Sequence, residues 1–341
     1  MRDIKSMEMK ELSEFMTELG EPGYRAAQVF SWLHAKRARS FDEMTSLPKA
    51  LRERLSAPAY ISGAEILEKQ VSDADGTVKY LFALEKDTII ESVLMKYGYG
   101  AAVCVSTQAG CAMGCTFCAS TLGGMSRDLS AGEMLSQVYE ISRDSGESVN
   151  HVVLMGSGEP LENYDEVMGF IRIINSPEGA GIGQRKITLS TCGLTDKIDK
   201  LSEEGLQITL AVSLHAPEDG IRNKIMPVSR KYPMEGLLAA CRRYAEKTGR
   251  RVTFEYALIK GVNDSDQCAK RLAARLKGML CHVNLIPING VAERKYEKSG
   301  ETRIAAFAEA LRAGGINVTV RRELGSDINA ACGQLRKRHL S

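Results

Sequence analysis

The sequence predicts an α/β fold built on a parallel β-sheet. From about residue 100 onward, apolar strand-like runs alternate with amphipathic helical runs such as GEMLSQVYEISRD and MEGLLAACRRYAEKTG. Successive βα units place their strands side by side with right-handed crossovers, which gives either a doubly wound sheet or a barrel. The predicted strands are AAVCVST, HVVLMG, KITLST, QITLAVSL, RVTFEYALI and HVNLIPI.

The segment before these units has a different pattern. Residues 7–60 carry apolar residues at helical spacing, as in MKELSEFMTEL, and the first helix is expected to stop at Gly20 and Pro22. From Ala64 the pattern alternates, and an Asp75-Gly76 turn predicts a β-hairpin in VSDADGTVKYLFALE. We expect an N-terminal accessory domain (1–90, helices then a hairpin), a core domain (91–320) and a C-terminal segment with a basic tail (321–341).

Composition and charge narrow the class of protein. The chain has 45 basic and 43 acidic residues, so its net charge of +2 neither favours nor excludes a nucleic acid. The start, MRDIKSMEMKEL, lacks the apolar core of a signal peptide, and no apolar run is long enough to span a bilayer. We therefore expect a cytoplasmic protein without membrane contact.

Its nine cysteines are odd in number and partly clustered, which favours metal or redox chemistry over a disulfide scaffold.

The cysteine cluster lies in CVSTQAGCAMGCTFC, after the first predicted strand. Cys111, Cys115 and Cys118 have C-x3-C-x2-C spacing, so that three thiolates can converge on one inorganic centre. An iron-sulfur cube held by three cysteines leaves one iron open to a further ligand. A zinc site would need a fourth ligand, and Cys104 could supply it across a six-residue gap that is unusual for such sites. Both alternatives stay open on spacing alone.

Further polar residues follow the other predicted strands. Gly156–Pro160, the GSGEP turn, comes directly after the second strand. The carboxyl ends of parallel strands share one edge of the sheet, where α/β proteins place their sites. We therefore expect the cluster and the turn to lie near four other strand-end residues, Ser190, Ser213, His215 and Asn289.

The motif CAMGCTFC, including Phe117 before the last cysteine, resembles the signature of radical S-adenosylmethionine (SAM) enzymes. The resemblance implies a partial barrel of six βα units and a 4Fe-4S cluster on Cys111, Cys115 and Cys118. It also implies that the open iron binds the amino and carboxylate groups of SAM, and that electron transfer then releases a 5′-deoxyadenosyl radical. The GSGE turn is similar to the SAM-binding motif of that family. The SAM contacts implied in this way are Gly158, Glu159, Ser190, Ser213, Leu214, His215 and Asn289.

A closer resemblance comes from the set CVSTQAGCAMGCTFC, GSGEPL, SLHAP, GVND, HVNLIP and DINAACGQL. Together these motifs resemble the adenine-C2 methyltransferases that modify 23S rRNA, in the peptidyl-transferase centre, and tRNA, 3′ of the anticodon. The N-terminal helices are similar to the accessory domain of that family. Ser157 and Cys192 depart from its usual residues, and neither departure removes a polar group that the chemistry needs.

The resemblance implies roles for three more residues and the use of two SAM molecules per turnover. Cys332 would accept a methyl group as an S-methylcysteine intermediate, and radical addition of that carbon to C2 would join protein and RNA. Cys104 would be the resolving thiol that frees the product and leaves a disulfide. Glu91 matches the family's proton acceptor, although a strand glutamate is equally well explained as structural.

The partners expected on this basis are 23S rRNA, tRNA and an electron donor such as flavodoxin or ferredoxin, with the protein as a monomer. Two other functions remain under consideration: the adenine-C8 methylating branch of the same superfamily, and a zinc-dependent RNA-binding module without catalysis. Basic residues expected to contact the RNA backbone are Arg127, Arg321, Arg322, Arg336, Lys337, Arg338 and the N-terminal group His34, Lys36, Arg37 and Arg39.

Overall fold

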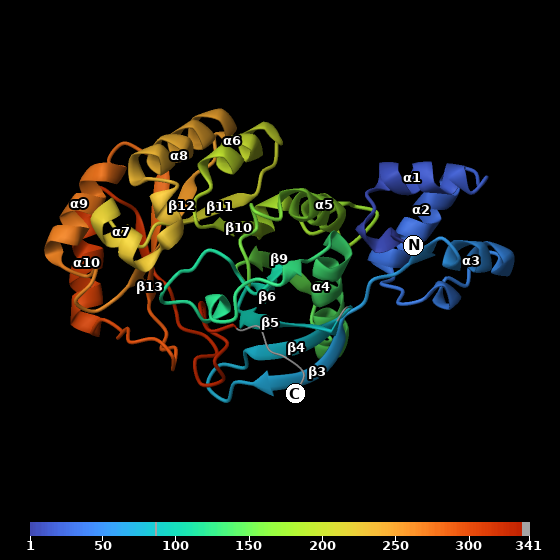
Figure 1. Cartoon of the computed structure of the whole chain (residues 1–341), viewed down its shortest axis with the longest axis horizontal. Helices are drawn as coiled ribbons and strands as arrows, with labels where there is room; N and C mark the ends of the chain where they lie inside the picture. Colours follow the sequence, from blue (N-terminus) through green and yellow to red (C-terminus); the bar gives the residue numbers. More distant parts are fainter. Residues whose placement is uncertain (86, 336–341) are drawn as a thin grey trace.

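A curved β-sheet with helices packed along its outer side forms the body of the computed structural model, which describes residues 1–85 and 87–335 (Figure 1). The strand order across this sheet is β14-β13-β12-β11-β10-β9-β6-β5-β4-β3. Its strands are β3 (Glu65–Val71), β4 (Val78–Leu84), β5 (Thr88–Tyr97), β6 (Gly100–Cys104), β9 (Val149–Leu154), β10 (Ile187–Thr191), β11 (Thr209–Ser213), β12 (Val252–Leu258), β13 (Cys281–Pro287) and β14 (Val318–Val320). Two short pairs, β1 (Arg2–Asp3) with β2 (Ala59–Tyr60) and β7 (Gln108–Ala109) with β8 (Arg127–Asp128), lie outside it.

The predicted parallel strands are confirmed as β6, β9, β10, β11, β12 and β13. They are neighbours in chain order, and every pairing between them is parallel. The strand interiors are apolar because one face packs inside the barrel and the other against helices. This arrangement is the partial βα barrel that the sequence predicts, and it brings the carboxyl ends of all six strands to one rim.

The helices cover the outer side of the barrel. α4 begins at a capping box in which Ser130 Oγ accepts from the Glu133 amide, and it ends at Gly146 with a left-handed φ of 69°. The core helices are α4 (Ala131–Ser145), α5 (Tyr164–Asn175), α6 (Thr195–Glu203), α7 (Asp219–Ile225), α8 (Met234–Thr248), α9 (Asp266–Leu276) and α10 (Glu301–Ala313).

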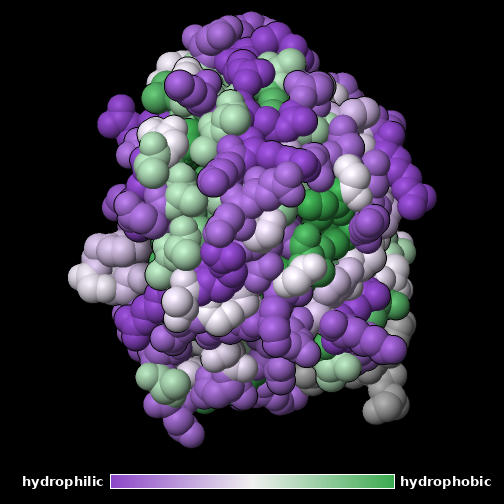
Figure 2. All heavy atoms as spheres, turned by 90° about the vertical axis from the view of Figure 1, so that its left-hand side faces the viewer, coloured by the Kyte–Doolittle hydropathy of each residue, from purple (hydrophilic) through white to green (hydrophobic). Residues whose placement is uncertain are grey.

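The outward faces of these helices are mainly hydrophilic. Figure 2 views the molecule from the side of α9 and α10, where purple, hydrophilic side chains predominate around small hydrophobic groups. Ion pairs join neighbouring helices on this surface, including Arg271 with Glu218 and Arg275 with Glu235. Within residues 1–85 and 87–335, no helix is both long and apolar enough to cross a bilayer.

The antiparallel strands β3, β4 and β5 extend the same sheet beyond β6. The predicted hairpin is confirmed, with Val71 opposite Val78 and Asp75 Oδ1 accepting from the Thr77 amide at the turn. β5 then pairs with both β4 and β6, so the hydrogen-bonded ladder is continuous. The domain boundary expected near residue 90 therefore falls within β5, and the sheet has no break there.

A small helical module precedes the sheet and packs on α4 (Figure 1). It contains α1 (Met9–Glu18), α2 (Tyr24–Phe30), a π-helical turn (Ser31–Ala35) and α3 (Lys49–Ser56). The buried Lys5 ammonium donates to Ser136 Oγ of α4 (2.9 Å), and His34 Nδ1 lies 3.1 Å from the Tyr139 hydroxyl of the same helix. These contacts fix the module to the barrel.

The basic residues of this module were candidates for contacting RNA, and the structure shows that three of them contact α4. Their contact with RNA stays a prediction. His34 is fully buried, Arg37 Nη1 donates to Ser142 Oγ (2.7 Å), and Arg39 Nε donates to Glu140 (3.0 Å). Lys36 lies over the Trp32 ring, 3.6 Å from its centroid. The charge pattern of the sequence could not reveal these contacts. A basic residue on a solvated helix face and a basic residue at an interface between helices look alike in the sequence.

Acidification should weaken the folded state through His34. Burial lowers the pKa of His34 from 6.5 to about 3. As pH falls below about 6.5, the His34 imidazole is therefore protonated in the unfolded chain and stays neutral in the folded chain. Stability is therefore lost progressively between about pH 6.5 and pH 3, by about 2 kcal/mol at pH 5. Urea denaturation at pH 7.5 and pH 5 should show this loss in the wild type and a smaller one in His34→Gln. Equal losses in both proteins would contradict the assignment.

Candidate functional site

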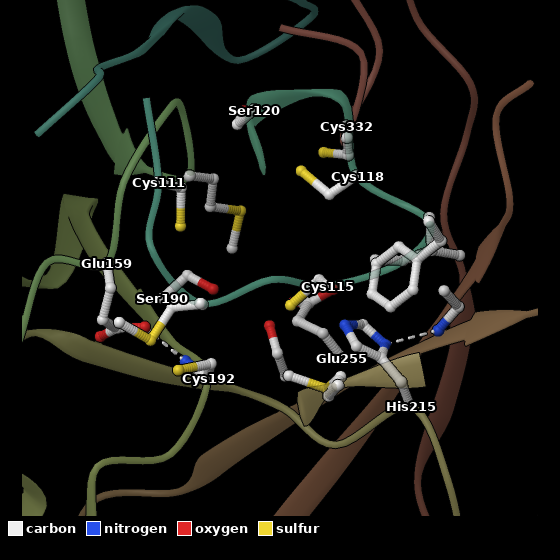
Figure 3. A pocket seen from close by; sticks show the side chains of 18 of the residues that line it. Cys111, Cys115, Cys118, Ser120, Glu159, Ser190, Cys192, His215, Glu255 and Cys332 are labelled. Atoms are coloured by element: carbon white, nitrogen blue, oxygen red, sulfur yellow. Dashed lines mark hydrogen bonds between the residues drawn. The ribbon is translucent and has the colours of Figure 1, made fainter. Parts of the chain in front are cut away.

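A cavity, partly open to solvent, lies at the carboxyl ends of the barrel strands. Its lining combines apolar side chains with a few polar groups, as small-molecule sites do. Residues from the ends of β9 to β13 form its floor, the loop after β6 forms one wall, and residues of the C-terminal segment close it (Figure 3). The strand-end location predicted from the sequence is therefore confirmed.

Cys111, Cys115 and Cys118 lie in the loop after β6 and line this cavity. Figure 3 shows their sulfur atoms arranged around a common space. All three are free thiols, and burial raises their pKa values, that of Cys111 to about 12. Without a cation the three sulfurs would stay protonated, whereas iron would replace the protons and stabilise the thiolates.

The chemistry of the three thiols suits an iron-sulfur cluster. Thiolates are the usual protein ligands of such clusters. The three-thiol donor set around a shared space therefore fits a 4Fe-4S cluster with one iron left open.

Close backbone packing holds the cysteine loop, and a buried arginine holds the floor of the cavity. Gly110 has φ 82°, and a Cβ there would lie 1.9 Å from the Gly124 carbonyl oxygen, so that only glycine fits. On the floor, the fully buried Arg222 donates from Nη2 to the Cys192 carbonyl (2.7 Å) and from Nε to the Leu214 carbonyl (3.1 Å). Arg222 thus ties the ends of β10 and β11 together.

Glu159 presents a buried carboxylate to the cavity from the GSGEP turn. Its two oxygens accept hydrogen bonds from the Leu161 amide (3.0 Å) and the Cys192 amide (2.7 Å). Burial raises the pKa of Glu159, while these amide hydrogen bonds oppose the shift. The turn needs glycine, because Gly158 has φ 111° and a Cβ would meet Gln108 N at 2.8 Å. A fixed carboxylate at this position can accept hydrogen bonds from an ammonium group.

The other strand-end residues predicted for SAM mostly share this cavity. Ser190, Ser213, His215 and Asn289 all line it, together with Gly158 and Glu159. Leu214 is buried and is not among the lining residues that the structure describes. Its proposed contact would have to come from its backbone, and it stays a prediction.

His215 is held in one tautomer. Its Nδ1 accepts from the Ala257 amide (2.9 Å), so the ring proton resides on Nε2. Burial lowers the pKa of His215 to about 3, and the imidazole is therefore neutral. The ring meets Phe117 edge to face at 5.0 Å, which makes the aromatic residue of the cysteine motif part of the packing around the floor.

Cys332 reaches the same cavity from the far end of the chain, more than 200 residues after the cysteine loop. Four hydrogen bonds hold its loop in place. Asn289 Nδ2 donates to the Cys332 carbonyl (3.1 Å), the Ala119 amide to the Gly333 carbonyl (2.7 Å), Ser120 Oγ to the Leu335 carbonyl (2.8 Å), and Gln334 Nε2 to the Gly290 carbonyl (2.9 Å). The C-terminal segment is thereby attached both to the cysteine loop and to the end of β13.

Cys332 and Cys104 both line a second, smaller cavity. Cys104 is the last residue of β6 and is buried, and burial raises its pKa to about 12. Both cysteines are free thiols. Two cysteines that lie more than 200 residues apart in the sequence therefore line one space, and Cys332 also lines the first cavity beside Cys118 (Figure 3).

Glu91 lies apart from both cavities. It is on β5, nearly fully buried, and its carboxylate is 3.9 Å from Lys79 Nζ. Lys79 in turn donates to the Ile328 carbonyl (2.7 Å) of the segment that precedes Cys332. Glu91 is thus linked to the Cys332 loop through Lys79, and its role as a proton acceptor stays a prediction.

Two arginines predicted to contact RNA have other surroundings. Arg127 forms an ion pair with Glu133 (2.6 Å) and donates from Nε to Thr88 Oγ1 (2.9 Å), so its donors serve the fold. Arg321 lines both cavities rather than the outer surface, whereas Arg322 is exposed. The tail residues Arg336, Lys337 and Arg338 lie outside the described residues.

Two buried charged residues of the site were missed by the sequence analysis. Glu255 lines the first cavity from β12 and accepts from Asn284 Nδ2 (3.0 Å), and Arg222 lies beneath the floor. A charged residue inside the apolar strand RVTFEYALI was a signal for Glu255. Arg222 lies in a polar stretch, which gave no comparable signal.

Comparison with known proteins agrees with this geometry. Residues 105–273 match the radical SAM superfamily, and residues 2–61 match the ribosomal RNA large subunit methyltransferase N-terminal domain. A probable dual-specificity RNA methyltransferase RlmN of Alkaliphilus oremlandii is 54% identical over 99% of this chain and 98% of the relative. Another, from Caldanaerobacter subterraneus, is 54% identical over 100% of this chain and 99% of the relative.

A solved structure gives the same result in three dimensions. The radical SAM methyltransferase from Sphaerobacter thermophilus superimposes with a TM-score of 0.93 at 46% identity, over 98% of this chain and 99% of that one. Radical SAM enzymes use a 4Fe-4S cluster and SAM, and the three-cysteine cavity fits both. The chain therefore belongs to the dual-specificity RNA methyltransferase family of the radical SAM superfamily.

Proposed function

We propose that this protein transfers a methyl group from SAM to C2 of an adenosine in 23S rRNA, in the peptidyl-transferase centre, and in tRNA, 3′ of the anticodon. The observation that carries the proposal is the position of Cys332. It lines one cavity with the three cluster cysteines and a second cavity with Cys104. A methyl carrier has to meet both a radical source and a resolving thiol, and this position adjoins both.

The first cavity holds the cofactors in this proposal. Cys111, Cys115 and Cys118 bind the 4Fe-4S cluster, and Glu159 accepts hydrogen bonds from the ammonium group of SAM. Ser190, Ser213, His215 and Asn289 surround the rest of SAM. When bound, the cluster and SAM supply one electron and an adenosyl radical that can take a hydrogen atom from a methyl group.

Cys332 carries the methyl group. Its sulfur accepts the methyl of one SAM, losing its proton and leaving S-adenosylhomocysteine, and this step makes up for the poor nucleophilicity of adenine C2. After hydrogen abstraction, the carbon on Cys332 bonds to C2, so protein and RNA are covalently joined. To restore the aromatic ring, the C2 proton and the unpaired electron must both leave. The electron would pass to the cluster, when bound, and Glu91 is our candidate for the base that removes the proton.

Cys104 releases the product. Its thiolate attacks the sulfur of Cys332, so that an S–S bond forms and the carbon–sulfur bond breaks. The carbon keeps the electron pair of that bond and takes a proton, which completes the methyl group on C2. An external reductant then restores both thiols. We place this reaction in the cytoplasm, with a monomeric enzyme and flavodoxin or ferredoxin as the electron donor.

The test is to identify the modified nucleoside. RNA incubated anaerobically with the cluster-loaded enzyme, SAM and a reductant should yield 2-methyladenosine on mass spectrometry of its nucleosides. Recovery of 8-methyladenosine would assign the protein to the C8 branch instead. Absence of any methylated adenosine, from an enzyme with full iron content, would contradict both.

A further inference from the structure

Arg321 occupies a position that the proposed reaction has not yet used. It follows β14 directly, and its backbone amide donates to the Leu285 carbonyl of β13 (2.8 Å). This bond continues the parallel pairing and directs the side chain into the barrel, where it lines both cavities beside Cys332. The next residue, Arg322, is exposed.

Most N–H donors of the Arg321 guanidinium are not used in strong hydrogen bonds within the described part of the chain. An arginine side chain carries five N–H donors. In the described part of the chain, the hydrogen bond found for this side chain runs from Nη1 to Met155 Sδ at 3.7 Å, and a thioether is a weak acceptor. The nearby Glu255 carboxylate accepts from Asn284 Nδ2 (3.0 Å) and attracts the Arg321 guanidinium electrostatically, without a hydrogen bond between the two within the described residues.

The location of these donors restricts what they can bind. They lie in the two cavities that Arg321 and Cys332 both line, and Cys332 carries the carbon that bonds to C2 in the proposed reaction. A backbone phosphate would remain outside, because an extruded nucleotide enters such a pocket base first. The acceptors of adenine closest to C2 are N1 and N3, and both are hydrogen-bond acceptors in the neutral base.

We infer that Arg321 binds the target adenine by donating hydrogen bonds to a ring nitrogen that flanks C2, N1 or N3. This inference rests on the proposed function. The contact would aim C2 at the carbon carried by Cys332, and it would withdraw electron density from C2 as that bond forms. Arg322 would contact the RNA backbone outside the pocket.

The experiment pairs protein variants with altered bases. Wild-type and Arg321→Met holoenzymes are given anticodon stem-loop RNAs whose adenosine 3′ of the anticodon is unchanged or replaced by 1-deaza-, 3-deaza- or 7-deazaadenosine. For the wild type, one of the 1-deaza and 3-deaza RNAs should bind roughly 10- to 100-fold more weakly than the unchanged RNA. Arg321→Met should bind the unchanged RNA and that analogue about equally, and the 7-deaza RNA should bind like the unchanged RNA to both proteins.

Two further variants separate this role from charge and from folding. Arg321→Lys keeps the charge without the planar fork and should recover part of the affinity lost in Arg321→Met. Arg322→Met should weaken binding of all four RNAs by the same factor. Iron content and SAM binding by equilibrium dialysis should match the wild type in every variant.

The outcomes distinguish the inference from the proposed function. If Arg321→Met still discriminates against the deaza RNA as the wild type does, the inference is wrong. It is also wrong if Arg321→Met loses SAM binding, because the guanidinium would then serve the cofactor. If instead the wild type forms no 2-methyladenosine from the unchanged RNA, the proposed function fails, whatever Arg321 binds.

Discussion

Replacing Cys104 by alanine is expected to trap a covalent complex between the protein and RNA. The variant keeps the three cluster cysteines and Cys332, so each step through carbon–carbon bond formation remains available. It lacks the thiol that shares the second cavity with Cys332, and the carbon–sulfur bond then has nothing to break it. A species of reduced mobility on a denaturing gel, sensitive to both protease and ribonuclease, should replace free methylated RNA.

The controls for this prediction come from the same two cavities. Cys104→Ala should retain wild-type iron content, and mass spectrometry should find its Cys332 methylated. Cys104→Ala,Cys332→Ala should form no adduct, since the carrier is missing. Loss of iron in Cys104→Ala would show that Cys104 is a cluster ligand. The assignment of Cys104 as the resolving thiol, with Cys111, Cys115 and Cys118 as the cluster ligands, would then be wrong.

Replacing Cys118 by alanine should remove the iron-sulfur cluster. The cluster has three cysteine ligands, and its fourth iron must stay open for SAM, so the two thiolates left in this variant cannot hold it. Anaerobically reconstituted Cys118→Ala should therefore lose most of its iron, sulfide and brown colour. The matched control is Cys192→Ala, because Cys192 is buried in the wall of the same cavity without being a predicted ligand. Its amide, which holds Glu159, is retained in that variant.

Cys192→Ala should therefore keep its iron and its colour. A zinc-binding module would behave differently, because wild-type protein reconstituted with iron and sulfide would stay colourless. Zinc in stoichiometric amount, with no cluster after reconstitution, would contradict the enzymatic assignment altogether.

The parallel sheet could be predicted because local pattern and global fold agree there, whereas its closure into a partial barrel was implied by the family resemblance. Six buried parallel strands each need a continuous apolar run and a helix after it, and both features are visible in the sequence. The joining of β3, β4 and β5 to the same sheet was not predictable, since an isolated hairpin and an extended sheet have the same alternation. β14 was missed because a three-residue edge strand has too few positions to show a pattern.

The candidate site could also be predicted only in part. The cluster cysteines, Glu159 and the strand-end residues followed from motif spacing and from the rule that strand ends share an edge. The contacts of the basic residues within the fold were not predictable, because the sequence gives a charge and not its partner. Arg127 and Arg39 were expected on an RNA surface and form ion pairs with Glu133 and Glu140, while Arg321 points into the barrel.

The two reacting thiols, Cys104 and Cys332, also differ in the structural elements that position them. Cys104 ends a strand with hydrogen-bonded neighbours on both sides, opposite Val93 of β5 and Val153 of β9. Cys332 is on a loop fastened by a few bonds to side chains and loop carbonyls. The resolving thiol is thus placed by a sheet and the methyl carrier by a loop. A change in the few bonds that anchor the loop would displace Cys332 while leaving Cys104 in place.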